Sequence, residues 1–289
     1  MTKKVGIIGG SGLYAMEGLI NIEELNVATP YGATSAPIVK GNLKGIDLDL
    51  HFIPRHGLGH VFSPSEVPYQ ANIWAMKKLG VDWIISVSAV GSLKEEIPPG
   101  DMILIDQFID RTKTRPSTFF HNGIIAHTAF GDPICPVLRS FLLEATRECT
   151  DKVHDGGTYV CMEGPAFSTR AESSLYRSWG ASVIGMTNIP EAKLAREAEI
   201  SYATLAMSTD YDCWHDGHDD VTVDQVIAIM NSNVELARKV LQAVLPKIEA
   251  YNGEPPFAGS LPKSIITSPE KFPQKRRSEL APLLDKYFP

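Results

Sequence analysis

Two carboxylates follow a short apolar segment in the C-terminal half of the chain. Residues 208–214 read STDYDCW and come directly after the run 200–207, which contains β-branched and aromatic side chains. Such a run is typical of a buried strand in a parallel sheet, and open α/β sheets bind ligands beyond the carboxyl ends of their strands. Asp210 and Asp212 would then converge on a ligand. A turn is the alternative, and it is the better interpretation of this stretch taken alone, because aspartate is common in turns.

Donors suited to an anion follow several other predicted strands. They are the backbone around Gly9, Gly10 and Gly12 and the residues Ser11, Arg55, His56, Ser88, Ala89 and Thr187. Glycines let the backbone approach an anion closely, and an arginine presents a fork of donors that matches phosphate oxygens. Each residue alone is more often a packing or capping residue, and a plain glycine turn explains 9–13 equally well. Together they predict a pocket for inorganic phosphate, without the lysine-bearing loop that would indicate ATP.

Strands and helices alternate along the chain. Strands are predicted at 5–8, 47–54, 83–93, 102–110 and 200–207, helices at 68–80 and 136–149, and a strand followed by a helix start within both 156–173 and 182–200. The alternation predicts the α/β class, as a single domain with a central mixed, largely parallel β-sheet flanked by helices. We expect residues 1–250 to form this domain. Residues 251–289 are expected to form a C-terminal tail that packs on the domain or on a neighbouring subunit.

Three other kinds of site are weighed against the phosphate pocket. Residues 10–15 fit GxGxxA, the dinucleotide fingerprint, but ATPYG stands at 28–32, where that fingerprint needs an acidic residue. The loop HDGHDD at 215–220 holds two histidines and three aspartates, which suit a metal, although such a loop is more often solvated. Ser11 does not lie in a GxSxG elbow, so a serine hydrolase has little support. We expect no metal and no dinucleotide.

Composition restricts the partners and the compartment. The chain has 289 residues and a formal net charge of −7, which argues against a nucleic-acid partner. It contains no run of about 18 apolar residues that could span a bilayer. No two of its four cysteines form a CxxC pair, and without a secretory signal they are expected to be reduced. These features predict a cytoplasmic protein with no membrane partner.

Several motifs occur in one order between residues 6 and 214. They are GIIGGSGL, RHGLGH, PYQANIWAMK, GSLKEEIPPGD, DQFIDRT, EGPAFSTRAES, MTNIPEAKLAREA and STDYDCW. In this combination the chain resembles the methylthioadenosine phosphorylases, trimeric members of the purine nucleoside phosphorylase family. The residues after about 250 lie outside this resemblance.

The resemblance implies a role for each matching position. Phosphate would be held by Ser11, Arg55, His56, Ser88, Ala89 and Thr187. Substrate would contact Met186 at the ribose, Phe167 at the base or sugar, Ser168, Val223 and Val226 near the base and 5′ substituent, and His127 from a neighbouring subunit. Gly185 departs from the pattern, because the human-type sequence has a larger polar residue there, and a contact at that position is in doubt. The resemblance implies a homotrimer with no cofactor, for which phosphate is a co-substrate.

The implied reaction gives the two aspartates a task. Phosphorolysis of methylthioadenosine releases adenine and 5-methylthioribose-1-phosphate, and the departing purine needs a proton or a strong hydrogen bond at N7. A carboxyl group whose pKa is raised by burial or by a second carboxylate can supply it. We therefore expect Asp210 to donate at N7 and accept from the 6-amino group, with Asp212 supporting it. The alternative is a purine nucleoside phosphorylase that acts on adenosine or on 6-oxo nucleosides such as methylthioinosine.

Overall fold

The computed structural model describes residues 2–14, 16–215 and 223–289, with the side chains at 11, 14 and 223–227 outside the description. The strands are β1 (Lys3–Gly9), β2 (Leu19–Leu25), β3 (Ile38–Leu43), β4 (Leu48–Pro54), β5 (Trp83–Ser92), β6 (Met102–Leu104), β7 (Gln107–Arg111), β8 (Val153–Asp155), β9 (Thr158–Met162), β10 (Val183–Gly185) and β11 (Ser201–Asp210). The helices are α1 (Tyr69–Lys78), α2 (Pro136–Cys149), α3 (Arg170–Ser178), α4 (Asn188–Glu197), α5 (Val223–Ala250), α6 (Gln274–Glu279) and α7 (Ala281–Leu284), with 3-10 turns at Ser11–Tyr14 and Pro269–Lys271.

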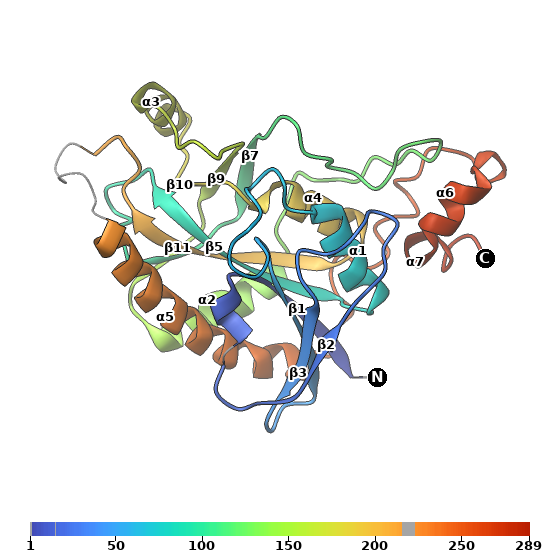
Figure 1. Cartoon of the computed structure of the whole chain (residues 1–289), viewed down its shortest axis with the longest axis horizontal. Coiled ribbons are helices and arrows are strands. Elements are labelled where there is room, and N and C mark those ends of the chain that lie inside the picture. The colour runs from blue at the N-terminus through green and yellow to red at the C-terminus, as the bar shows by residue number, and fades with distance from the viewer. Residues whose placement is uncertain (1, 15, 216–222) are drawn as a thin grey trace.

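The described strands form one mixed sheet in which β5 is the central member. Strands β4, β1, β5 and β11 run parallel, and β10, β9 and β7 continue the sheet beyond β5. Helices α2 and α5 cover one face, whereas α1 and α4 cover the other (Figure 1). Because both faces are covered, β1 and β5 are almost wholly apolar where they pair, as parallel sheets require. The predicted fold class, α/β with a mixed, largely parallel sheet flanked by helices, is confirmed.

The strand predicted at 102–110 is wrong, because the chain forms two strands there. Strand β6 pairs with β11 and β8, whereas β7 pairs in parallel with β9. The chain changes neighbours at Ile105 and Asp106, where the Asp106 carboxylate accepts a hydrogen bond from the amide of Gly157 at 3.1 Å. Ile105 is fully buried, so the apolar pattern continues across the break and does not reveal it.

The strand that precedes the carboxylate pair is longer than predicted. The apolar run 200–207 suggested an end at residue 207, but β11 continues to Asp210. The continuation pairs with the end of β5, and the register shifts between Ser208 and Asp210, which lies opposite Gly91. This irregularity brings Asp210 onto the tip of the central strand.

The segment after α5 packs against the domain through apolar and charged contacts. Leu261, Leu280 and Leu284 are fully buried. The carboxylate of Glu199, itself buried, accepts hydrogen bonds from the amide of Leu261 at 2.7 Å and the hydroxyl of Tyr287 at 2.8 Å. Helices α6 and α7 lie at the opposite end of the molecule from the tips of β5 and β11 (Figure 1). Among the described residues no helix combines the length and the apolar character that crossing a bilayer requires.

Candidate active site

The two aspartates meet above the tip of β5. A Cβ atom on Gly91 would lie 3.0 Å from Asp210 Oδ1 and 3.4 Å from the Cβ of Asp212, so both side chains use the space that this glycine leaves open. Burial raises the pKa of Asp210, a hydrogen bond from the Thr209 hydroxyl at 2.7 Å opposes that rise, and the charge of Asp212 adds to it. Asp212 Oδ2 is buried and has no hydrogen-bond partner within the described part of the chain. The pair can therefore hold a proton for a ligand, and one of its oxygens is available as an acceptor.

Two hydroxyl groups lie together, one from Ser88 on β5 and one from Thr187 at the start of α4. Ser88 Oγ is 3.4 Å from Thr187 Oγ1 and 3.3 Å from the hydroxyl of Tyr159. Ser88 and Thr187 are buried, whereas Ala89 is exposed although its strand neighbours on both sides are buried. The structure thus brings the hydroxyl groups of Ser88 and Thr187 together beside the exposed Ala89, and such hydroxyl donors suit an anion.

Arg55 is buried and is bound mainly by the protein itself. Its Nε and Nη2 donate to the carboxylate of Glu191 at 2.7 and 3.0 Å, and Nη2 also donates to Ser86 Oγ at 2.7 Å. Nη1 donates to the carbonyl oxygen of Val87 at 3.2 Å. Only one N–H of Nη1 then lacks an acceptor among the described residues. Arg55 can therefore give an anion one direct hydrogen bond, besides its charge, much of which is balanced by Glu191.

His56 is neutral near pH 7 and has a fixed tautomer. Burial lowers its pKa to about 4, and the positive charge of Arg55 lowers it further. Its Nδ1 is 2.8 Å from the carbonyl oxygen of Phe62, so Nδ1 carries the hydrogen and Nε2 is an acceptor. The ring stacks on His60 at a centroid distance of 4.2 Å. An acceptor at this place suits a phosphate that still carries a proton.

The glycine loop forms one wall of a cavity of about 570 Å³ that His56 and His60 also line. A Cβ on Gly9 would lie 2.4 Å from Leu13 Cδ1, so a larger residue there would displace the leucine side chain, whereas Gly10 faces open space. The carbonyl oxygen of Gly12 accepts hydrogen bonds from Nε and Nη2 of Arg238 on α5, at 2.9 and 2.6 Å. The side chain of Ser11 lies outside the described residues. The backbone of the loop is thus fixed from α5 and open toward the cavity.

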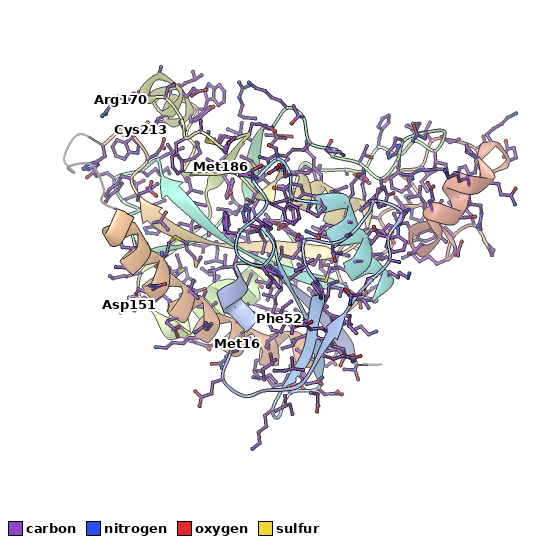
Figure 2. The ribbon with its side chains drawn as sticks, in the orientation of Figure 1. Met16, Phe52, Asp151, Arg170, Met186 and Cys213 are labelled. Carbon is purple, nitrogen blue, oxygen red and sulfur yellow. The ribbon has the colours of Figure 1, made fainter. Side chains whose placement is uncertain are left out.

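Residues predicted to touch the sugar and the base lie in two further loops. A Cβ on Gly164 would be 2.6 Å from Met186 Sδ, so the methionine packs directly on the 164–168 loop. The carbonyl oxygen of Ser168 accepts a hydrogen bond from the thiol of Cys213 at 3.3 Å, which links this loop to the segment after Asp210. Met186 and Cys213 both lie at this end of the sheet (Figure 2). Phe167 is 84% exposed and is placed on the surface.

The departure at Gly185 has a steric reason in this structure. A Cβ at this position would lie 2.0 Å from the hydroxyl oxygen of Tyr159. Tyr159 is fully buried and reaches Ser88, so the space beside the hydroxyl pair is filled from β9. Position 185 itself can make no side-chain contact.

Some predicted residues are not joined to this group. The backbone amide of His127 donates to the carbonyl oxygen of Ser264, and the exposed side chain lies beside the C-terminal segment. The side chains of Val223 and Val226 lie outside the described residues, as does most of the loop 215–220. Across residues 2–14, 16–215 and 223–289 no three His, Cys, Asp or Glu side chains gather as a metal site would require.

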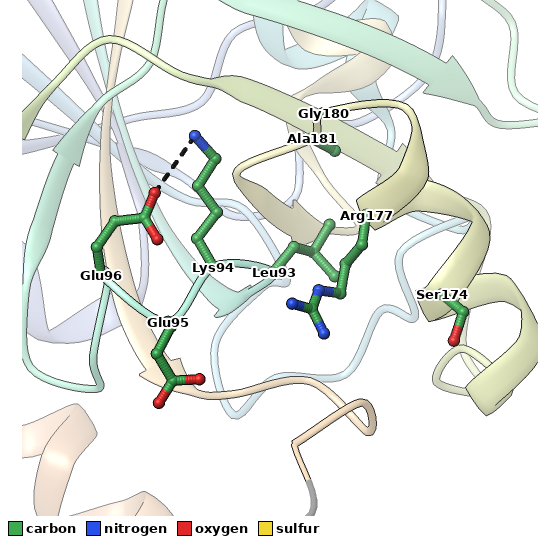
Figure 3. A pocket seen from close by; sticks show the side chains of 8 residues that line it. All are labelled: Leu93, Lys94, Glu95, Glu96, Ser174, Arg177, Gly180 and Ala181. Atoms are coloured by element: carbon green, nitrogen blue, oxygen red, sulfur yellow. Dashed lines mark ion pairs between the residues drawn. The ribbon is translucent and has the colours of Figure 1, made fainter.

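A second cavity, of about 430 Å³, lies between the segment after β5 and helix α3 (Figure 3). An ion pair of 3.7 Å between Lys94 and Glu96 stands on one side, and Arg177 points in from α3. Arg177 packs on the ring of Trp214 at 3.4 Å. This cavity contains neither the aspartates nor the hydroxyl pair.

Sequence reasoning missed two buried groups that organise the site. Glu191 binds Arg55. In the sequence, the only sign of Glu191 was its place after Pro190 in the motif MTNIPEAKLAREA. Arg115 donates to main-chain carbonyl oxygens in both of the loops that hold Met186 and Ser168. A contact to backbone leaves no pattern of residue types, so Arg115 had no signal in the sequence.

Comparison with known proteins gives the family. The family model described as the phosphorylase superfamily matches residues 4–246. Proteins named S-methyl-5'-thioadenosine phosphorylase from Geobacter sulfurreducens and from a Synechocystis species are each 54% identical over 99% of this chain, and cover 100% and 88% of their own length. The match spans 288 residues, so the expectation that the resemblance ends near residue 250 is wrong.

Solved structures agree with this assignment. A methylthioadenosine phosphorylase from an antarctic soil metagenomic library is 46% identical, with a TM-score of 0.94 over 98% of this chain and 100% of that one. The methylthioadenosine phosphorylase of Schistosoma mansoni in complex with adenine is 32% identical, with a TM-score of 0.79 over 98% of both chains. The resemblance predicted from the motifs is confirmed, and the chain belongs to the phosphorylase superfamily.

Proposed function

We propose that this chain catalyses the phosphorolysis of 5′-methylthioadenosine to adenine and 5-methylthioribose-1-phosphate. One observation carries the proposal: the hydroxyl pair at Ser88 and the carboxylate pair above Gly91 lie three residues apart on β5. Three residues of an extended strand span about 10 Å. This separation leaves room for a sugar between an anion and a base, above the exposed Ala89.

Each group then has a task in the reaction. Phosphate is held by Ser88, Thr187 and the glycine loop, and it attacks C1′ as the C1′–N9 bond breaks. The sugar acquires positive charge, which the phosphate stabilises by its own charge. The charge of Asp212 helps to raise the pKa of Asp210 and so keeps a proton on that carboxyl group before the reaction. Asp210 then gives this proton to N7 of the departing purine.

The identity of the base is determined by the same carboxyl group. A carboxyl oxygen accepts a hydrogen bond from a 6-amino group, whereas a 6-oxo purine offers no donor there. A mismatched buried polar group costs about 1–3 kcal/mol. This favours adenine, and methylthio is favoured at the 5′ position by an apolar wall to which we assign Val226, with His127 of a neighbouring subunit nearby.

The proposal includes an assembly and a compartment. We propose a homotrimer, because His127 lies away from its own site while the apolar side chains of Ile125 and Ile266 beside it are 41% and 64% exposed. Light scattering after gel filtration should then give three copies of the 31.6 kDa chain.

We also propose that phosphate is the only co-substrate, with no cofactor, and that the four free cysteines reflect the reducing cytoplasm. Residues 1–250 form the catalytic domain and 251–289 its packed tail.

The test is adenine release from methylthioadenosine with and without inorganic phosphate, beside adenosine, methylthioinosine and inosine. Phosphate-dependent release that is fastest with methylthioadenosine supports the proposal. Faster turnover of the inosine compounds would assign the chain to the 6-oxo branch. Release that needs no phosphate would make it a hydrolase and would contradict the proposed anion site.

A further inference from the structure

Arg115 is a buried cation that lies between two loops of the site. It is 7% exposed as a residue, and its side chain is completely buried. Its Nη1 donates to the carbonyl oxygens of Met186 and Ile189, at 2.5 and 2.8 Å. Its Nη2 donates to the carbonyl oxygen of Glu163 at 2.5 Å. One guanidinium therefore ties the chain on both sides of Thr187 to the chain that enters the 164–168 loop.

The two loops carry opposite halves of the proposed substrate site. The first loop holds Met186 and Thr187, on the sugar and phosphate side. The second holds Phe167 and Ser168, on the base side. Arginine suits this position because its planar fork presents donors in fixed directions, whereas lysine has a single nitrogen on a flexible stem.

Arg115 is itself held in place through Glu163. The Glu163 carboxylate accepts hydrogen bonds from the backbone amide of Lys113 at 2.5 Å and from the hydroxyls of Thr114 and Ser65 at 2.8 and 2.5 Å. Burial opposes the charged form of Glu163, but these bonds prevail and lower its pKa to about 2. Residues 113 and 114 therefore bind the same segment, at Glu163, to which the Arg115 guanidinium donates.

We propose that Arg115 is a positioning residue that sets the spacing between the phosphate side and the base side of the site. The inference rests on the proposed function, which assigns those two sides. The attacking phosphate and the departing base must stand on opposite sides of C1′, and a displacement of about 1 Å can slow such a reaction about 100-fold. Arg115 touches no reacting atom and acts only through the two loops.

Arg196 provides a matched control. It is also 7% exposed, and it donates to the carbonyl oxygens of Ala129 and Asp132 at 2.6 and 2.5 Å. Its guanidinium packs on Phe257, away from the residues of the site. The experiment compares Arg115→Lys with Arg196→Lys in the full-length protein. For each we measure the melting temperature, kcat, and KM for phosphate and methylthioadenosine.

Both variants should lose melting temperature, because Arg196→Lys gives up donors to two carbonyl groups and Arg115→Lys gives up donors to three. Only Arg115→Lys should lower kcat, by about 10- to 100-fold, while Arg196→Lys keeps kcat within about threefold. Equal losses of kcat in both, or wild-type kinetics in Arg115→Lys, would overturn the inference.

Two further measurements keep the inference testable. If Arg115→Lys does not fold, Glu163→Gln loosens the same segment at a partly exposed residue and should lower kcat in the same sense by a smaller factor. If the wild-type protein releases no adenine, the proposed function fails. The affinity of the two lysine variants for adenine, measured by calorimetry, then tests the role of Arg115 separately. Adenine should bind more weakly to Arg115→Lys alone. Equal affinities in the two variants would contradict the positioning role.

Discussion

Tyr159 and Gly185 share one space. The hydroxyl oxygen of the tyrosine stands 2.0 Å from where the glycine would carry a Cβ atom, and it reaches Ser88 Oγ at 3.3 Å. A side chain at 185 would therefore push the tyrosine away from the hydroxyl pair. The polar group beside the phosphate side is therefore the Tyr159 hydroxyl on β9, and it leaves no room for a side chain at position 185 on β10.

Gly185→Ala should accordingly destabilise the protein by about 1–3 kcal/mol, the usual cost of overpacking a core, and should raise KM for phosphate. Chemical denaturation and steady-state kinetics measure the two effects. Gly131→Ala is the control, since its Cβ meets nothing within 4 Å, and it should stay within about 0.5 kcal/mol. The double variant Tyr159→Leu with Gly185→Ala should recover much of the stability without recovering phosphate affinity. A stable, fully active Gly185→Ala would show that this space can adapt.

Replacing Asp210 by asparagine should lower kcat/KM for methylthioadenosine by about 100-fold, because the proton donor at N7 is lost. The amide can donate to a 6-oxo group, so the ratio of methylthioinosine to methylthioadenosine turnover should rise at least about tenfold. Competition between the two nucleosides in one reaction gives that ratio directly. An unchanged preference for the 6-amino substrate would remove Asp210 from base recognition.

The pH dependence of the reaction follows from the raised pKa of Asp210. The protonated carboxyl is the active form, so kcat/KM should fall as the pH rises through this pKa. The negative charge of Asp212 contributes to the rise, so Asp212→Asn lowers the pKa of Asp210. The basic limb of the profile should therefore move to lower pH in that variant. If the basic limb of the profile lay at the same pH in Asp212→Asn as in the wild-type protein, another group would have to supply the proton.

Stability should depend on pH through Glu197, which lies outside the site. Burial raises its pKa from 4.5 to about 7, although Thr118 and the backbone of Phe119 donate hydrogen bonds to it. The folded protein then binds a proton more tightly than the unfolded chain, so the free energy of unfolding falls as the pH rises from about 4.5 to 7. The loss attributable to this group is about 3 kcal/mol.

Glu197→Gln should flatten that part of the stability profile, as measured by denaturation at several pH values. The exposed Glu24→Gln serves as its control and should keep the wild-type slope. Parallel profiles for wild type and Glu197→Gln would mean that the carboxylate is already charged in the folded protein at pH 5.

The sequence predicted which residues stand near the tips of the central strands better than it predicted the pairing or the bounds of those strands. Asp210, Ser88 and Thr187 were selected because polar residues follow apolar runs at these places, although β5 and β11 continue to Ser92 and Asp210. The contact between Arg55 and Glu191 spans 136 positions, and no local pattern connects residues so far apart. The division of 102–110 into two strands depends on which neighbours each half finds, a property of the whole sheet. Arg115 gave no signal in the sequence because its shortest hydrogen bonds go to backbone carbonyl groups, which every residue carries.

The last residues of the chain determine how the enzyme can be handled in the laboratory. Lys286 and Tyr287 both bind the carboxylate of Glu199, whose side chain is 1% exposed. Removal of Lys286 and Tyr287 would leave this buried carboxylate with fewer partners. A protein without them would keep its reacting groups but should unfold more readily, so these two residues determine how long the folded protein lasts in storage.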